Sequence, residues 1–180
     1  MILAAIDIGS NAARLLITEV IVEANNKPLF NKLNLFRVPL RLGFDVFETG
    51  VISKQKTGML LQTMKAFKHL MNAYEVNHFK ACATSAMRDA KNATDIIRKV
   101  KLETDMSIEV ITGDVEAGLI FENHIAETLD KDRSYMYIDV GGGSTEISFF
   151  SNAVLTFKES FNIGTIRLLQ GMVHDKTWEV

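Results

Sequence analysis

Two segments of the chain repeat one short pattern, and this repeat limits the possible folds more than any other feature. In residues 5–17 and 137–149, an apolar strand leads into an aspartate, a β-branched residue and a glycine. Small polar residues and a second apolar strand follow in both, and Asp7 aligns with Asp139. Because repetition turns a weak motif into a paired one, the pattern indicates a duplicated domain built around two equivalent hairpins.

The residue types in these hairpins suit phosphate binding. Glycine and serine keep the turns free of bulky side chains, so backbone N–H groups can approach an anion closely. An aspartate at the end of each first strand can hold a hydrated divalent cation that screens phosphate oxygens. The alternative is an ordinary tight turn whose aspartate is satisfied locally. Neither a P-loop nor a glycine-rich strand-to-helix dinucleotide fingerprint occurs in the chain.

Composition excludes several other classes of function. The net charge of -2 and pI near 6.1 provide no basic field for nucleic acid. No apolar stretch approaches the ~18 residues of a membrane span, and the N-terminus lacks the basic region of a signal peptide. The four histidines show no metal-ligand spacing, and we interpret the single cysteine, Cys82, as a small core residue. We therefore expect a cytoplasmic protein without nucleic-acid or membrane partners.

The hydrophobic pattern predicts an α/β fold with a mixed sheet and flanking helices. A loop is expected at 43–50, and Ser53 is expected to cap a helix that runs to about Tyr74. Its methionines are interpreted as core residues. The expected strands are 2–8, 14–22, one within 31–42, 79–84, 107–111, 134–140, 146–150 and 154–160. Further helices are expected at 94–103, from 114 to about 129, and from Gly164 onward.

The charged connector at 130–133 is the predicted domain boundary. Residues 1–130 would form a first domain and residues 131–180 the start of a similar, apparently incomplete second domain. The 180-residue chain is therefore expected to be inactive by itself, because a cleft closed by two domains would be unfinished. Exposed apolar strands of such a domain would favour a homodimer.

Five motifs occur in order along the chain, at residues 7–11, 83–90, 111–117, 139–146 and 162–168. Together they resemble the exopolyphosphatase/guanosine-pentaphosphate phosphohydrolase (Ppx/GppA) family. The resemblance spans nearly the whole chain. It implies the actin-like, ribonuclease H-like duplicated fold, which agrees with the repeat. It also implies a cytoplasmic hydrolase that removes terminal phosphate from inorganic polyphosphate or guanosine pentaphosphate with Mg²⁺ as cofactor.

The resemblance also implies roles for single residues. Glu116 matches the general base that deprotonates the attacking water, and Arg88 matches an arginine that contacts substrate phosphate. Asp139 and Glu146 match acidic residues near the magnesium and the water, and Asp7 is added to them as a metal ligand. The residues that match phosphate-binding loops are Ser10, Asn11, Gly141, Gly142, Gly143 and Ser144.

Each of these residues also has a plainer explanation. Glu116 could be an exposed helix-start carboxylate, and Arg88 could be a solvated arginine that pairs with Asp89 or another acid. Glu146 could point outward from its strand, and Asp7 could accept hydrogen bonds within its own turn. These alternatives make no use of a shared site.

The chain departs from the family pattern at three positions. Val115 and Gly118 stand where the family usually has glutamate and arginine, and Ala12 stands where serine is common. Two other functions therefore remain open. One is an actin-fold nucleotide-dependent kinase or ATPase, and the other is a non-catalytic sensor that binds polyphosphate or an alarmone.

Overall fold

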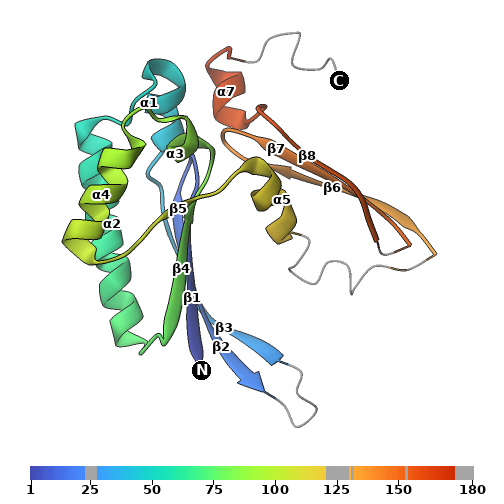
Figure 1. Cartoon of the computed structure of the whole chain (residues 1–180), viewed down its shortest axis with the longest axis horizontal. Coiled ribbons are helices and arrows are strands. Elements are labelled where there is room, and N and C mark those ends of the chain that lie inside the picture. Colours follow the sequence, from blue (N-terminus) through green and yellow to red (C-terminus); the bar gives the residue numbers. More distant parts are fainter. Residues whose placement is uncertain (23–27, 121–129, 131, 153, 173–180) are drawn as a thin grey trace.

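A computed structural model describes residues 1–22, 28–120, 130, 132–152 and 154–172, and arranges them as two sheets with helices (Figure 1). The first sheet has the strand order β3-β2-β1-β4-β5. Its members are β1 (Ile2–Ile8), β2 (Ala13–Val22), β3 (Pro28–Val38), β4 (His78–Ala83) and β5 (Glu109–Val110). β1, β2 and β3 are antiparallel neighbours, whereas β4 is parallel to β1 and to β5. The predicted mixed α/β sheet with flanking helices is confirmed.

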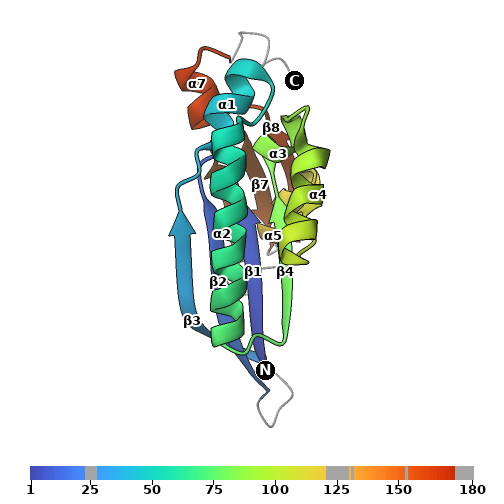
Figure 2. The ribbon, with the colours of Figure 1, turned by 90° about the vertical axis from the view of Figure 1, so that its left-hand side faces the viewer.

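Helices cover one face of this sheet. α2 (Lys54–Ala73) and α4 (Ala93–Thr104) lie side by side across it in both views (Figures 1 and 2). Alternate residues of β1 and β2 face these helices, because successive side chains of a strand point to opposite faces. Leu60, Met64 and Phe67 of α2 are buried in the same core. The predicted cap is present, since Ser53 Oγ accepts a hydrogen bond from the amide of Lys56 at 3.3 Å.

The predicted loop at 43–50 is wrong, because residues 42–49 form helix α1 (Leu42–Thr49). The side chains of Leu42, Val46 and Phe47 are buried on one side of α1. Gly50, whose φ is 78°, ends the helix. The glycines suggested a turn, but Gly43 is needed for close packing inside the helix. A Cβ on Gly43 would lie 2.8 Å from Phe47 Cε2 and 3.0 Å from Ser10 Cβ.

Other differences from the expected elements are smaller. Helix α3 (Ser85–Asp89) was not predicted, and β5 is only two residues long. Met59 is 43% exposed rather than part of the core. α5 (Gly113–Ile120) is the start of the helix expected from residue 114, and the rest of that prediction lies outside the described residues. Within the described chain, no helix is long and apolar enough to cross a membrane.

The second sheet is an antiparallel meander of β6 (Ser134–Val140), β7 (Thr145–Ser151) and β8 (Val154–Phe161). α5 packs on β7 and β8, and Lys158 Nζ donates to the Asp114 carbonyl at 3.0 Å. The short helix α7 (Thr165–Leu169) begins after Gly164, as predicted, and contacts α1. In Figure 1 the second sheet and α5 lie on the opposite side of the first sheet from α2 and α4.

The internal repeat is preserved in the hydrogen bonds of the two hairpins. Residues 9–12 connect β1 to β2 and are called the first loop here; residues 141–144 connect β6 to β7 and are the second loop. Gly9 N donates to Ala12 O at 3.0 Å in the first loop, and Gly141 N donates to Ser144 O at 2.8 Å in the second. The two turns therefore have equivalent backbone structure.

The equivalence extends to the helix behind each loop. The amide of Gly43 in α1 donates to Ser10 O at 2.8 Å, and that of Ile166 in α7 donates to Gly142 O at 2.9 Å. Amides in the first turn of a helix have no partner within the helix, so the loop carbonyls satisfy them. Each loop is thus fixed from behind by its own helix.

The contact between α7 and the second loop leaves no room for a side chain at Gly164. A Cβ there would lie 2.4 Å from the carbonyl carbon of Gly142 and 2.5 Å from the amide nitrogen of Gly143. Both are backbone atoms, so the clash cannot be relieved by a rotamer change.

We predict that Gly164→Ala destabilises the protein by about 1–3 kcal/mol, because the loop backbone must move away from α7. Gly58→Ala is the matched control, since nothing lies within 4 Å of a Cβ at this position in α2. It should stabilise the protein by roughly 0.5–1 kcal/mol, because alanine favours a helix interior. Urea unfolding of both variants measures the two effects, and equal effects in both would contradict the described packing.

Candidate active site

Both loops open onto one cavity of about 680 Å³, which lies between the first sheet, α5 and the β6–β7 hairpin. Most of the residues predicted from the sequence line it. They are Asp7, Ser10, Asn11, Glu116, Asp139, Gly141, Gly142, Ser144 and Glu146. The two aspartate turns, far apart in the sequence, therefore face a shared space. Arg88 and Gly143 do not line the cavity.

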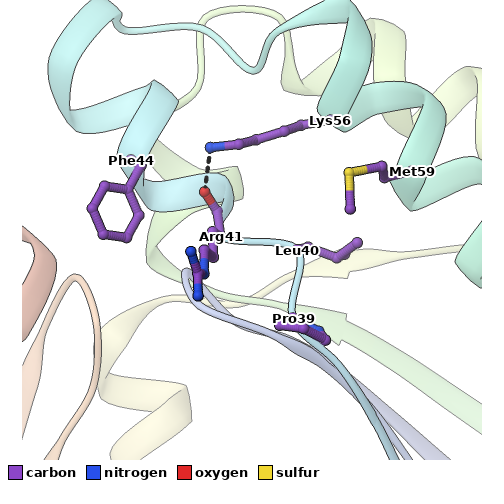
Figure 3. Close-up of a pocket in the computed structure, with 6 residues that line it drawn as sticks. All are labelled: Pro39, Leu40, Arg41, Phe44, Lys56 and Met59. Carbon is purple, nitrogen blue, oxygen red and sulfur yellow. Dashed lines mark hydrogen bonds between the residues drawn. The ribbon is translucent and has the colours of Figure 1, made fainter.

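A second hollow, of about 440 Å³, lies between the N-terminal end of α1 and the first turns of α2 (Figure 3). Its lining residues are Pro39, Leu40, Arg41, Phe44, Lys56 and Met59. Lys56 is already engaged, because its Nζ donates to the Arg41 carbonyl at 2.6 Å and pairs with Asp45. None of the paired-loop residues reaches this hollow, so we assign the candidate site to the larger cavity.

The alternation of β1 explains how the first loop reaches the cavity. Ile6 and Ile8 are buried against the helices, so Asp7 points to the opposite face of the sheet. Beyond the strand, Ser10 is buried and its Oγ lies 2.7 Å from Ser85 Oγ, a hydrogen bond between the ends of β1 and β4.

Ser85 also lines the cavity, and sequence reasoning missed it as a site residue. β4 runs parallel to β1 with Ala83 opposite Ile8, so Ser85 and Ser10 lie equally far beyond the paired strand ends. The parallel pairing of these two motifs was the signal that could have identified it. Cys82 is half-buried and lines the cavity rather than the core, and burial raises the pKa of its thiol.

The backbone of the loops offers unused donors to this space. The amides of Ser10, Asn11, Gly142 and Ser144 donate to no acceptor in the described part of the chain. All four residues line the cavity. Clustered free N–H groups form an anion-binding concavity, so the two loops can receive an anion from opposite sides.

The two loops differ in the charge opposite their aspartates. Asp7 is paired across the hairpin with Arg14, whose guanidinium lies 3.1 Å from its carboxylate. The equivalent partner of Asp139 is Glu146, so the second hairpin presents two acids side by side. Glu146 is only 3% exposed and accepts a hydrogen bond from Ser160 Oγ at 2.8 Å, so it does not point into solvent. Burial raises the pKa of Asp7, and the nearby charge of Asp139 adds to this effect.

Glu116 faces the same cavity from the first turn of α5. Its side chain is 24% exposed, and its buried Oε2 has no hydrogen-bond partner among the described residues. Burial, followed by the charge of Glu146, raises the pKa of Glu116 to about 7, although Arg88 opposes the shift. A carboxyl group with this pKa can accept a proton near neutral pH.

Arg88 and Gly143 do not line the cavity, but each lies against a residue that does. Arg88 donates to the Ile111 carbonyl at 2.7 Å, and its guanidinium lies 3.8 Å from Glu116 Oε2. The acid beside Arg88 is therefore Glu116, the base candidate, whereas Asp89 pairs with Arg167. Gly143 is packed so tightly that a Cβ would lie 2.4 Å from Ser85 Oγ.

The carboxylates of Asp139 and Glu146 are oxygen ligands of the kind that a hydrated magnesium ion prefers. No described Lys or Arg forms an ion pair with Asp139 or Glu146, and both line the cavity. Among the described residues, no three His, Cys, Asp or Glu side chains form a cage for an ion. Mg²⁺ usually binds through one or two carboxylates and completes its shell with water and substrate phosphate, so a cage is not required.

The fold and the site together define an actin-like α/β protein whose two equivalent hairpins meet across an acidic cavity. Residues 20–179 match the Ppx/GppA phosphatase family. The chain belongs to this family.

Individual relatives agree with this assignment. The chain is 33% identical to the bifunctional 3-dehydroquinate synthase/phosphatase of Fusobacterium nucleatum, over 93% of the chain and 26% of the relative. It is 30% identical to exopolyphosphatase 2 of Mycobacterium tuberculosis, over 95% of the chain and 54% of the relative. The crystal structure of an exopolyphosphatase from Cytophaga hutchinsonii superposes with a TM-score of 0.84 at 31% identity, over 99% of this chain and 56% of that one. The chain thus spans about half the length of the exopolyphosphatases it matches.

We predict that Glu116→Gln stabilises the protein at pH 8 but not at pH 4. Folding raises the pKa of Glu116 from 4.5 to about 7, so the protein loses stability as the pH rises between these two values. The neutral amide avoids this cost, so the gain at pH 8 should be roughly 1–3 kcal/mol. Denaturant unfolding in a chelator at both pH values measures it.

Glu48→Gln, at an exposed position in α1, is the matched control and should change stability by less than about 0.5 kcal/mol at either pH. A stability gain for Glu116→Gln that is the same at pH 4 and pH 8 would contradict the buried, raised-pKa state of Glu116.

Proposed function

We propose that the chain forms the catalytic cleft of a phosphoanhydride hydrolase that removes terminal phosphate from inorganic polyphosphate or guanosine pentaphosphate. The observation that carries the proposal is the position of Glu116. Glu116 and both loops line the same cavity, and its buried Oε2 has no hydrogen-bond partner among the described residues. A base, an anion-binding backbone and an acidic pair are the groups that such a hydrolysis needs.

The terminal phosphate would be bound by the free amides of both loops. These donors are held in place by α1 and α7, so they are ready to bind the charge that develops on the equatorial oxygens in the transition state. Ser10 and Ser85 add hydroxyl groups at the same place. Preorganised donors of this kind reduce the reorganisation that the reaction would otherwise require.

Glu116 would accept a proton from a water molecule as the water oxygen bonds to the terminal phosphorus. The bridging P–O bond then breaks, the shortened substrate leaves with the bridging oxygen, and inorganic phosphate is released. The pKa near 7 supports this role, because a base works best when its pKa lies close to the working pH. The acidic neighbours that raise this pKa lie in the same cavity.

Asp139 and Glu146, with Asp7 nearby, would hold Mg²⁺. When bound, the ion would neutralise phosphate oxygens and relieve the repulsion between these carboxylates. Arg88, in its present position, would limit the rise of the Glu116 pKa rather than contact substrate.

The names of the relatives support the substrate class. The Mycobacterium tuberculosis and Cytophaga hutchinsonii proteins are exopolyphosphatases, and the Fusobacterium nucleatum protein carries a phosphatase activity in its name. Because this chain spans only part of each, activity is best assayed in the full-length gene product.

The test compares phosphate release by the wild type, Glu116→Gln and the control Glu48→Gln, with polyphosphate and guanosine pentaphosphate in the presence of Mg²⁺. We expect kcat to fall roughly 10²–10⁴-fold for Glu116→Gln and to remain unchanged for Glu48→Gln. Wild-type kcat/KM should fall as pH drops through about 7, because Glu116 becomes protonated.

Unchanged turnover in Glu116→Gln would show that the proposed base is wrong. Tight polyphosphate binding without hydrolysis by the wild type would favour a sensor instead. Sugar-stimulated turnover of ATP would favour a kinase.

A further inference from the structure

The motif at 162–168 contains an arginine to which the proposed chemistry gives no role. Arg167 lies on α7, and its side chain is only 12% exposed. Its Nε donates to the carbonyl of Gly143 in the second loop at 2.6 Å, and its guanidinium forms an ion pair with Asp89 of α3. The same group lies 4.1 Å above the ring of Phe47 in α1. One side chain thus joins four separate segments.

These contacts connect the two sheets of the site. α1 and α3 are attached to the first sheet, whose β1 and β4 ends carry Ser10 and Ser85. The second loop belongs to the second sheet, and α5 with Glu116 packs on that same sheet. The distance between the first loop and the base candidate therefore depends on contacts that cross from one sheet to the other.

Two other crossing contacts have a direction: Gln170 Nε2, just after α7, donates to the Phe44 carbonyl of α1 at 2.9 Å, and Arg88 of α3 pairs with Glu116 of α5. The contacts made by the second loop itself, apart from those of Arg167, are close but carry little directional force. Gly142 approaches Ser10, and Gly143 approaches Ser85 and Phe47, at distances that would exclude a Cβ. Glycine surfaces of this kind pack closely but can slide, since dispersion contacts have no fixed direction. Arg167 adds a charge-assisted ion pair and a hydrogen bond, which fix orientation. Lysine could not replace it, because only the guanidinium has donors in a rigid fork and a flat face to stack on Phe47.

We propose that Arg167 is a positioning residue that clasps the second loop to α1 and α3 and thereby sets the separation of the two loops. The effect on turnover rests on the proposed function, whereas the effect on loop separation does not. Misplacement of a catalytic group by about 1 Å can reduce turnover roughly 10²-fold, so the clasp should matter although it touches no reacting atom.

The first arm of the test measures the separation directly. Spin labels at Ala66→Cys in α2 and Val154→Cys in β8, both exposed positions, report the distance between the sheets in a Cys82→Ala background. The parent should give one narrow distance distribution by pulsed electron spin resonance. Arg167→Gln should broaden or shift it, and Asp89→Asn should do so less, because it keeps the Gly143 bond and the stacking on Phe47.

Arg98→Gln is the matched control, since Arg98 forms an exposed ion pair with Asp95 on α4, away from the cavity. It should leave the distribution unchanged. Thermal unfolding of each variant confirms that a folded protein is being measured. If Arg167→Gln does not fold, the test rests on Asp89→Asn alone. A distance distribution for Asp89→Asn that is the same as that of the parent then overturns the proposal.

The second arm measures phosphate release by the full-length gene product. We expect kcat/KM to fall roughly 10–100-fold for Arg167→Gln, and Arg167→Lys should not restore it. The Arg167→Gln/Asp89→Asn double variant should be no worse than Arg167→Gln, because both substitutions break one clasp.

The two arms separate the two proposals. A wild type that releases no phosphate overturns the proposed function, and the distance measurement still decides the clasp. An active wild type whose folded Arg167→Gln variant keeps either the narrow distribution or the full kcat/KM overturns the clasp and leaves the proposed function standing.

Discussion

Each loop is held from behind by an amide of the helix that follows the three antiparallel strands beginning with its hairpin, and the shape of the cavity depends on these hydrogen bonds. α1 binds the carbonyl of Ser10, and α7 binds that of Gly142. The loop carbonyls are thus occupied by the helices, whereas the amides of Ser10, Asn11, Gly142 and Ser144 have no acceptor in the described part of the chain. The glycines make this possible, since a Cβ at Gly43 or Gly164 would push helix and loop apart.

The duplication is symmetric in backbone but not in charge. Arg14 neutralises Asp7 in the first hairpin, whereas Glu146 stands beside Asp139 in the second. The positive side of the site is therefore provided mainly by backbone dipoles, and the negative side by a compact group of acids. Glu116 lies within reach of that group, which explains why burial and repulsion act together on its pKa. One repeated hairpin pattern can in this way present both free backbone donors and an acidic pair to the same cavity.

The sequence predicted the mixed sheet and nearly all of its strands, and most of the site residues that it indicated line the cavity, because apolar alternation and a repeated turn are local signals. It failed at α1, where Gly43 and Gly50 suggested a loop. Gly43 serves a tertiary contact with Ser10 that no local pattern reveals. The family resemblance assigned Arg88 to substrate phosphate, and this stays a prediction; in the structure its guanidinium donates to the Ile111 carbonyl. Ser85 was missed because its role depends on the parallel pairing of β4 with β1, which is a long-range property. The contacts of Arg167 depend in the same way on how the two sheets are placed together.

We expect both loops to bind one shared anion through their amides. Chemical-shift titration of the ¹⁵N-labelled protein with tripolyphosphate and Mg²⁺ measures this binding at each amide. The amides of Ser10 and Asn11 should shift together with those of Gly142 and Ser144, and all four should follow a single binding curve. Shifts confined to one loop, or two curves with different dissociation constants, would contradict it.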